Sequence, residues 1–119
     1  MTDESSNRPS GHYSPYAVHN DMIFISGQLP FDTQRNMPDG IMGQTRQVLQ
    51  NLLWVLTDAG SSISNVLQMR IYLSNIDDWD AVNIIYAEFF GAHKPARCVV
   101  PTGPLHYGAL IEIEAVAHV

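Results

Sequence analysis

The chain has 119 residues and a net charge of -6, with 45% hydrophobic and 15% charged residues. These values are typical of one folded domain and exclude a disordered chain or a pair of full domains. The acidic balance argues against a surface that neutralises nucleic-acid phosphates, and the single cysteine excludes an internal disulfide.

The amino-terminal segment, residues 1–10, is polar and rich in Ser, Asn and Pro. We therefore expect a flexible lead-in there, followed by a single domain at residues 11–119. The segment lacks the apolar stretch of a signal peptide. Nowhere does the sequence approach the roughly 20 consecutive apolar residues of a membrane helix. We expect a cytoplasmic protein without a membrane partner.

Two short strands and a long helix are expected in the first half of the domain. Tyr16 to His19 and Asp21 to Gly27 are rich in aromatic and β-branched residues, and a turn at Asn20-Asp21 joins them. From Ile41 to Ala59 the apolar spacing becomes helical, and Gly60 is placed to end the helix. Its buried stripe comprises Ile41, Thr45, Val48, Leu49, Leu52, Val55, Leu56 and Ala59, and its solvated side Gln44, Arg46, Gln47 and Gln50.

A strand, a helix and two further strands are expected in the second half. Val66 to Leu73 alternates, with Leu67, Met69, Ile71 and Leu73 on the face expected to be buried. The helix runs from about Asp78 to Phe90, with Asp77 or Asp78 as its N-cap and Gly91 after it. Its buried stripe comprises Trp79, Val82, Ile85, Tyr86 and Phe89. Strands follow at Arg97 to Val100 and at Ala109 to Val119, and on the second of these Ala109, Ile111, Ile113, Ala115, Ala117 and Val119 share one face.

Together these elements predict an α+β two-layer domain, in which two helices cover one face of a sheet. The other face of the sheet mixes apolar side chains with polar ones, namely Gln68, Arg70, Tyr72, Glu112 and Glu114. Such a face packs well against identical neighbours when its charges are paired. We therefore expect a closed homo-oligomer with ligand sites between subunits.

The residues best suited to binding and catalysis are Arg97 and the pair Glu112 and Glu114. An arginine grips a carboxylate through two parallel charge-assisted hydrogen bonds, and a glutamate holds or activates a water molecule. This combination suits a site that binds a small acid and adds water to it. The alternative is an inter-strand ion pair between Arg97 and a glutamate, and the residues alone leave both open.

Several blocks of the sequence follow one another along the chain: Tyr13, Ile25-Ser26-Gly27-Gln28-Leu29-Pro30, Gln44 to Leu52, Ala59-Gly60, Val82-Asn83, Tyr86, Phe89-Phe90, Pro95-Ala96-Arg97 and Ile111 to Ala115. Through these blocks the chain resembles the reactive intermediate deaminase (Rid, or YjgF-type) family, from about Gly11 to Val119. The resemblance implies a chorismate-mutase-like homotrimer in which three mixed sheets form a central barrel, with sites in the clefts between subunits. It also implies hydrolysis of 2-imino and enamine acids, of the 2-aminoacrylate and 2-iminobutanoate type, to 2-oxo acids and ammonia, without a metal or organic cofactor.

The resemblance implies catalytic roles for Glu112 and Tyr13 and substrate-binding roles for Arg97, Ser26, Asn83, Cys98 and Val99. Arg97 would hold the substrate carboxylate, and Glu112 would orient the attacking water. Arg70 would neutralise one of the two glutamates, Glu112 and Glu114, while the other serves the site. The alternative is that both glutamates are structural charges of the barrel. Around Tyr13 the family pattern is broken at His12 and Pro15, which leaves the aim of its hydroxyl open.

Ser26, Asn83 and Cys98 each have a structural alternative. The Ser26 hydroxyl suits either the pocket or its own turn, and Asn83 is better explained by holding a neighbouring loop than by ligand contact. Cys98 stands one position before the usual family cysteine, where this chain has Val99. Because one residue reverses the face on a strand, we expect Cys98 to be a small buried group. The backbone at Cys98 and Val99 stays available to the substrate.

The segment Pro101 to Gly108 departs most from the family pattern, so the sequence leaves the substrate's side chain open. Thr102, His106 and Tyr107 are candidates to border the pocket. The five histidines show no recognised metal spacing, and we expect no metal. Two other functions stay open: a non-catalytic regulator that binds small carboxylates, and, disfavoured by the acidic charge, an endoribonuclease-type translation inhibitor.

Overall fold

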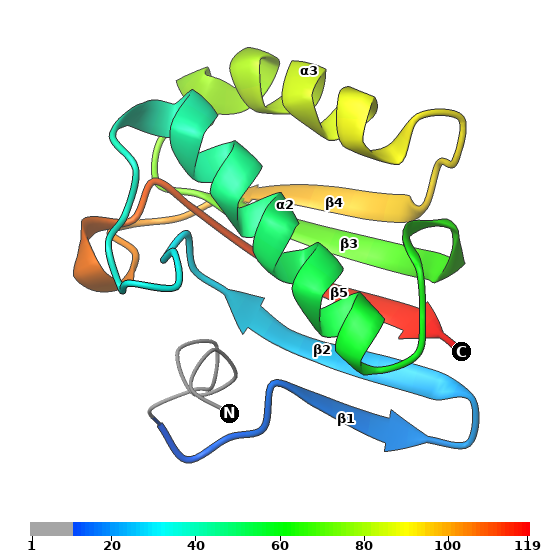
Figure 1. Cartoon of the computed structure of the whole chain (residues 1–119). Coiled ribbons are helices and arrows are strands. Elements are labelled where there is room, and N and C mark those ends of the chain that lie inside the picture. The colour runs from blue at the N-terminus through cyan, green and yellow to red at the C-terminus, as the bar shows by residue number, and fades with distance from the viewer. Residues whose placement is uncertain (1–10) are drawn as a thin grey trace.

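A computed structural model describes residues 11–119 of the chain, and the lead-in expected at residues 1–10 lies outside the described residues. In chain order the main elements are β1 (Tyr16–His19), β2 (Met22–Gln28), α2 (Gly40–Asp58), β3 (Val66–Leu73), α3 (Trp79–Phe90), β4 (Ala96–Pro101) and β5 (Ile111–His118) (Figure 1). Short 3-10 helices lie at Ile63–Asn65, Ile76–Asp78 and His106–Gly108. All expected strands and both expected helices are present, with ends that differ by at most two residues from the sequence prediction.

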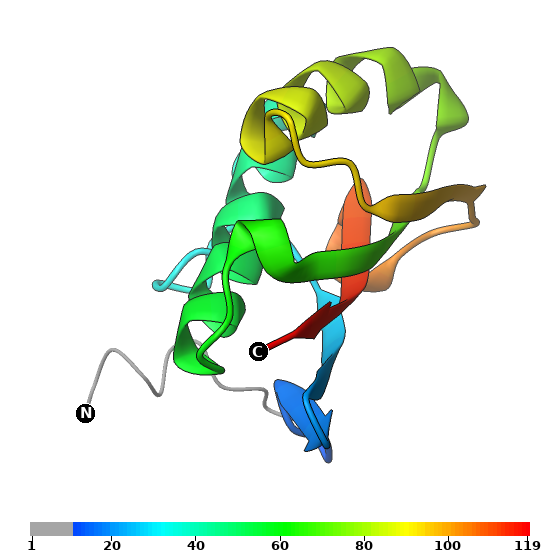
Figure 2. The ribbon, with the colours of Figure 1, turned by 90° about the vertical axis from the view of Figure 1, so that its right-hand side faces the viewer.

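The five strands form one mixed sheet in the order β1-β2-β5-β3-β4. β3 and β4 run parallel, and the other neighbours are antiparallel. Both helices pack on one face of this sheet, as the view turned by 90° shows (Figure 2). The predicted α+β two-layer architecture is confirmed. We call the uncovered side the open face, defined by Arg70, Tyr72, Glu112 and Glu114.

The first hairpin follows its predicted turn. His19 pairs with Met22, so the loop consists of Asn20 and Asp21 alone, and Asn20 has a φ of 55°. Two-residue hairpin loops favour such left-handed positions, which asparagine adopts more readily than most residues. The turn places β1 at the outer edge of the sheet, beside β2.

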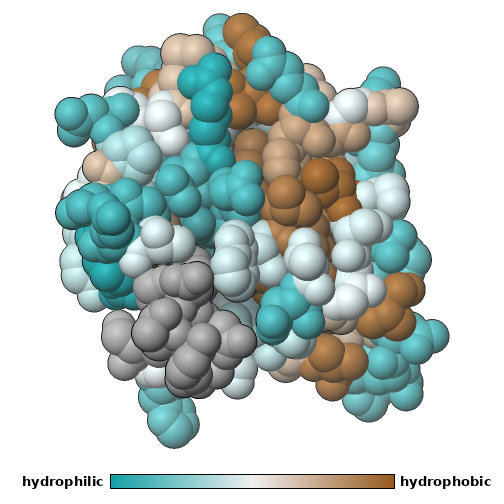
Figure 3. Space-filling model, in the orientation of Figure 1, coloured by the Kyte–Doolittle hydropathy of each residue, from teal (hydrophilic) through white to brown (hydrophobic). Residues whose placement is uncertain are grey.

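The core lies between the helices and the covered face of the sheet. Its largest fully buried side chains include Ile23, Leu52, Leu56, Met69, Ile71, Leu73, Ile111 and Ile113. On the outer surface of the helical side, polar residues cover the left part of the view while apolar residues gather right of its centre (Figure 3). Within residues 11–119, neither helix combines the length and the apolar character needed to span a membrane.

The alternation in β3 fails at its first residues. Leu67 was expected on the buried face, yet it is 43% exposed, and Val66 is fully buried instead. Val66 pairs with Ala117 and Gln68 pairs with Val116, so Leu67 is one extra residue on its strand. Such a bulge shifts the face of every residue before it, which a strict alternation does not predict. Val119, expected on the same face as Ala117, is exposed and lies one residue beyond the end of β5 at His118.

The start of α3 also differs from the prediction. Asp78 occupies the N-cap position, but its side chain makes no capping hydrogen bond. The Asn75 side chain instead accepts a hydrogen bond from the Asp77 N–H at 3.0 Å, because a 3-10 turn precedes the helix. On the buried stripe, Phe90 is more deeply buried than Trp79 or Phe89. Gly91, with a φ of 61°, ends the helix as expected.

Gln44 shows that one residue on the predicted solvated side of α2 is buried. It was expected on the solvated side, but only 6% of its surface is exposed. Its Nε2 donates to the Pro38 carbonyl at 3.0 Å, and its Oε1 accepts from the Leu110 N–H at 2.9 Å. The side chain therefore joins the loop before α2 to the segment that leads into β5. Helical spacing alone does not reveal that a glutamine has buried partners.

Replacing Gln44 with alanine is expected to lower the free energy of unfolding by about 1–3 kcal/mol, because the Leu110 N–H would lose its partner in a half-buried site. Gln50, exposed on the same helix, provides the matched control: Gln50→Ala should change stability by less than about 0.5 kcal/mol. Urea unfolding followed by circular dichroism measures both. Equal stability of the two variants would contradict this role of Gln44.

Candidate functional site

Arg97 is held by side chains of α3. Its Cζ lies 4.7 Å from the ring centroid of Trp79 and 5.1 Å from that of Tyr86. Its Nη1 donates a hydrogen bond to Asn83 Oδ1 at 2.9 Å. Because Trp79, Asn83 and Tyr86 are spaced four and three residues apart, they project from one side of the helix. We call these four residues the arginine group.

The ion pair between Arg97 and a glutamate, left open by the sequence, is absent among the described residues. Arg70 instead pairs with Glu114, with 3.7 Å between Nη1 and Oε2, which confirms that Arg70 neutralises one of the two glutamates. Tyr72 also donates a hydrogen bond to Glu114. This hydrogen bond, together with burial, raises the pKa of Tyr72 to about 12. Glu114 is thus engaged on the open face.

Glu112 lies over the backbone of Gly27. A methyl group placed on Gly27 would overlap Glu112 Oε2 and also contact its Cδ. Ile25 pairs with Ala115 and Gln28 with Ile113, so the intervening Ser26 and Gly27 form a bulge in β2. The bulge and the missing side chain together make room for the carboxyl group.

The Glu112 carboxyl group is suited to accept a proton. Burial raises its pKa, an effect that His106 opposes and the negative charge of Glu114 reinforces. A carboxylate with a raised pKa is a stronger base than one in water. Glu112 therefore differs from Glu114, for which Arg70 and Tyr72 supply partners.

Ser26 binds the segment that carries Tyr13. Its Oγ donates to the Ser14 carbonyl at 2.6 Å, and its N–H donates to the Pro15 carbonyl at 3.0 Å. The expected alternative, a bond within its own turn, is replaced by a bond to a more distant segment. Tyr13 itself is 56% exposed. We call Tyr13, Ser26, Gly27 and Glu112 the glutamate group.

Arg97 and Glu112, the titratable residues of greatest interest in the two groups, lie on opposite faces of the sheet. Arg97 pairs with Met69, which is fully buried on the covered face. Glu112 pairs with Tyr72, three residues further along β3 and therefore on the open face. One chain accordingly does not bring the guanidinium of Arg97 and the carboxyl of Glu112 together.

Cys98 and Val99 point in opposite directions on β4. Cys98 pairs with Arg70 and is exposed, so the prediction of a small buried group is wrong. The face reversal itself is correct, but it turns Cys98 toward the open face, which no helix covers. Val99 lies on the side of Arg97, where it is partly buried and packs against the core.

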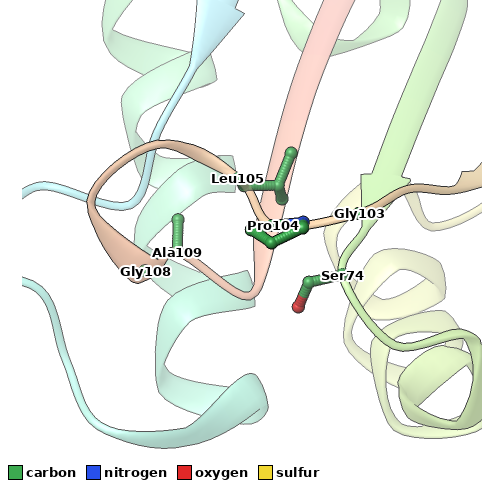
Figure 4. A pocket seen from close by; sticks show the side chains of 6 residues that line it. All are labelled: Ser74, Gly103, Pro104, Leu105, Gly108 and Ala109. Atoms are coloured by element: carbon green, nitrogen blue, oxygen red, sulfur yellow. The ribbon is translucent and has the colours of Figure 1, made fainter.

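The divergent loop between β4 and β5 lines a shallow pocket of about 340 Å³ (Figure 4). Its lining is Ser74, Gly103, Pro104, Leu105, Gly108 and Ala109. None of the seven predicted site residues is among them. Tyr107, in the left-handed region with a φ of 61°, is 73% exposed and packs edge-on against Phe31 at 5.3 Å. Among residues 11–119, no three His, Cys, Asp or Glu side chains gather as metal ligands would.

Sequence reasoning missed three members of these groups. Trp79 and Tyr86 were assigned to the buried stripe of α3, and Gly27 was named only as a strand end and as part of a family block. The signal for the first two was available, since Trp79, Asn83 and Tyr86 share one helical face. Their contact with Arg97 depends on the pairing of β4, which local spacing does not specify.

A family model described as endoribonuclease L-PSP matches residues 4–119. Among relatives, the RutC family protein PH0854 of Pyrococcus horikoshii is 40% identical over 117 residues, which cover 97% of this chain and 93% of the relative. The chain belongs to the Rid (YjgF/RutC) family. Another Rid-family relative, the 3-aminoacrylate deaminase RutC of Acinetobacter baylyi, is 36% identical over 118 residues, covering 98% of this chain and 94% of that protein.

Solved Rid-family structures share this fold. The Rid family protein YyfA of Yersinia pestis has a TM-score of 0.91 at 38% identity, with 98% of this chain and 97% of that chain covered. The structure of Escherichia coli TdcF with bound serine has a TM-score of 0.90 at 28% identity and covers 96% of this chain and 94% of that chain. The α+β architecture is therefore that of its family.

Proposed function

We propose that this Rid-family protein hydrolyses reactive 2-imino and enamine acids, of the 2-aminoacrylate and 2-iminobutanoate type, to 2-oxo acids and ammonia. The observation that carries the proposal is Arg97, fixed by α3 without a carboxylate partner among the described residues. The raised pKa of Glu112 supports it. A further support is the relative named 3-aminoacrylate deaminase, which matches almost the whole chain.

In the proposed reaction, Arg97 binds the substrate carboxylate through N–H groups that Asn83 leaves free. Glu112 accepts a proton from a water molecule as the water oxygen bonds to the imine carbon. That proton passes to the nitrogen, which gives a 2-amino-2-hydroxy acid. The hydroxyl proton then moves to the amino group as the carbon–nitrogen bond breaks, so that ammonia leaves and the 2-oxo group forms. Tyr13 is proposed to lie beside the reacting atoms, while Ser26 orders its segment. The backbone of Cys98 and Val99 lines the substrate, and no cofactor takes part.

We further propose that each site is completed by two chains of a homotrimer. The sheet separates Arg97 from Glu112 within one chain. In this proposal the arginine group of one chain meets the glutamate group of its neighbour. The open face carries exposed Phe24 and the exposed thiol of Cys98 beside the charged groups. Three such faces would form the interior of the chorismate-mutase-like barrel.

Two other functions are alternatives to imine hydrolysis. A regulator that binds small carboxylates without turnover is favoured by the relative TdcF, whose structure holds serine. An endoribonuclease is suggested by the family description, but the net charge of -6 disfavours a surface that attracts RNA. The cytoplasmic location stays a prediction, and one relative, mmf1 of Schizosaccharomyces pombe, is named as mitochondrial.

The deciding experiment measures 2-oxobutanoate release from 2-iminobutanoate that threonine dehydratase generates in the same solution. The protein should accelerate release above the spontaneous rate, and parallel reactions with 2-aminoacrylate and 3-aminoacrylate define the substrate class. Binding of 2-oxobutanoate without acceleration of any imine would favour the regulator. Cleavage of RNA without imine hydrolysis would favour the endoribonuclease.

Gly27→Ala is expected to lower the rate of imine hydrolysis by roughly tenfold or more, since a misplaced catalytic group loses much of its effect. The added methyl group would displace the carboxylate of Glu112. Stability should change little, because the end of a flexible side chain can move aside. Gly103→Ala is the matched control, since its methyl group would meet nothing within 4 Å. Full activity of Gly27→Ala in the same imine assay would contradict the proposed placement of Glu112.

A further inference from the structure

Arg97 is unusually well ordered by its neighbours for an exposed side chain. It lies on β4 at the edge of the sheet, yet Trp79 and Tyr86 both contact its guanidinium and Asn83 binds Nη1. A free arginine side chain loses rotamer entropy when a ligand fixes it. These three contacts impose much of that order before any ligand arrives.

The kind of contact matters as much as the number. Aromatic rings attract a guanidinium through its flat face, whereas a carboxylate binds the N–H groups at its edge. Stacking therefore fixes the group without using the donors that a substrate needs. Only Nη1 is engaged by a side-chain acceptor, Asn83 Oδ1, among the described residues. The remaining N–H groups of Arg97 stay available for two parallel bonds to one carboxylate.

A purely structural role explains Tyr86 better than Trp79. Tyr86 is 6% exposed and packs on Phe90 with 4.7 Å between ring centroids, as a core residue does. Its buried hydroxyl forms no well-aligned hydrogen bond among residues 11–119. Burial raises its pKa, and the nearby guanidinium of Arg97 opposes that rise. Trp79 is only partly buried, and its ring is the nearer of the two to Arg97. Core packing alone does not require an indole at this position.

We propose that Trp79 and Tyr86 are positioning residues that hold the guanidinium of Arg97 by its face and thereby set the affinity of the site for carboxylates. The inference rests on the proposed function in one respect, that Arg97 binds the substrate carboxylate. Since the rings act through Arg97 and touch no reacting atom, their loss should change ligand binding and KM rather than kcat.

Trp79→Leu removes the ring, Trp79→Phe keeps one, and Trp54→Leu removes the only other tryptophan, which is 39% exposed on α2. Calorimetric titration with 2-oxobutanoate measures carboxylate affinity, and the imine assay separates KM from kcat. Trp79→Leu should weaken binding and raise KM by roughly five- to tenfold, the order expected for one cation–π contact. Trp79→Phe should recover most of the affinity, and Trp54→Leu should match the wild type.

Equal affinity of Trp79→Leu and the wild type, equal weakening by Trp54→Leu, or a loss confined to kcat would overturn the inference. Failure of the proposed function has a different signature, in which the wild type accelerates no imine. The side-chain NMR signal of Arg97 Hε then decides, because the ring current of a stacked indole shifts it upfield. The shift should disappear in Trp79→Leu and largely persist in Trp79→Phe; an unshifted wild-type signal would refute the stacking.

Discussion

Replacing Arg97 with alanine should lower kcat/KM for 2-iminobutanoate by about a hundredfold or more, since truncating one partner of a desolvated charge pair costs about 2–5 kcal/mol. The substrate carboxylate would lose its bidentate partner, and no described residue in the arginine group carries another positive charge. Arg97→Lys should recover only part of the loss. An ammonium group cannot form two parallel hydrogen bonds to a carboxylate, and it has no flat face to stack on an aromatic ring. The imine assay measures both variants.

Asn83→Ala is the matched control, since it removes one hydrogen bond to Arg97 but leaves the guanidinium in place. Its effect should be smaller than that of Arg97→Ala, at about tenfold or less, the value of one hydrogen bond to a charged group. Undiminished activity of Arg97→Ala would remove the carboxylate clamp from the mechanism. The chemistry would then have to be sought around the glutamate group alone.

Arg97→Ala also allows a test of the two-chain site. Neither Arg97→Ala nor Glu112→Gln chains alone form a site with both native residues. If neighbouring chains of a closed oligomer supply them, random mixing in equal amounts gives each site a chance of about one half times one half, or about one quarter, of holding both. Co-expressed chains should therefore recover about that share of wild-type activity. No recovery in verified mixed oligomers would mean that both residues come from one chain.

The second large effect is expected for Glu112→Gln, which should lower kcat by roughly 10²–10⁴, the usual contribution of general base catalysis. Glutamine keeps the size of the side chain and its fit over Gly27 but cannot accept the proton of water. In the wild type, the rate above the spontaneous reaction should fall as the pH drops through the raised pKa of Glu112. That dependence should be absent in the variant. Glu114→Gln is the control, because Arg70 and Tyr72 already engage Glu114.

The same substitution should raise stability at neutral pH. Burial raises the pKa of Glu112 in the folded chain, so the folded state favours the protonated form, and its contribution to stability is lost as the pH rises through that pKa. Glutamine removes the buried charge. The stability of Glu112→Gln should therefore exceed that of the wild type at neutral pH, and the difference should narrow toward low pH. Urea unfolding at several pH values measures it, and an unchanged difference would contradict the burial of this charge.

The sequence predicted the elements well where one local rule applied. The Asn20-Asp21 turn, the helical stripe of α2 and the alternation of β5 are repeating patterns within a few residues, and all three are present. The prediction failed where a distant partner intervened. Leu67 is turned outward by a bulge against β5, and Gln44 is buried because the Leu110 N–H and the Pro38 carbonyl bind it.

By itself, the sequence determined the α+β class, the family blocks and the placement of Glu112 and Glu114 on one strand face, because these follow from composition and short-range spacing. Only the tertiary structure decided that Arg97 and Glu112 lie on opposite faces of the sheet, since this depends on how β3 pairs with both β4 and β5. It also decided that Trp79 and Tyr86 flank Arg97 and that Gly27 receives the Glu112 carboxyl group. Such contacts join segments far apart in the chain, and no local periodicity encodes which segments become neighbours.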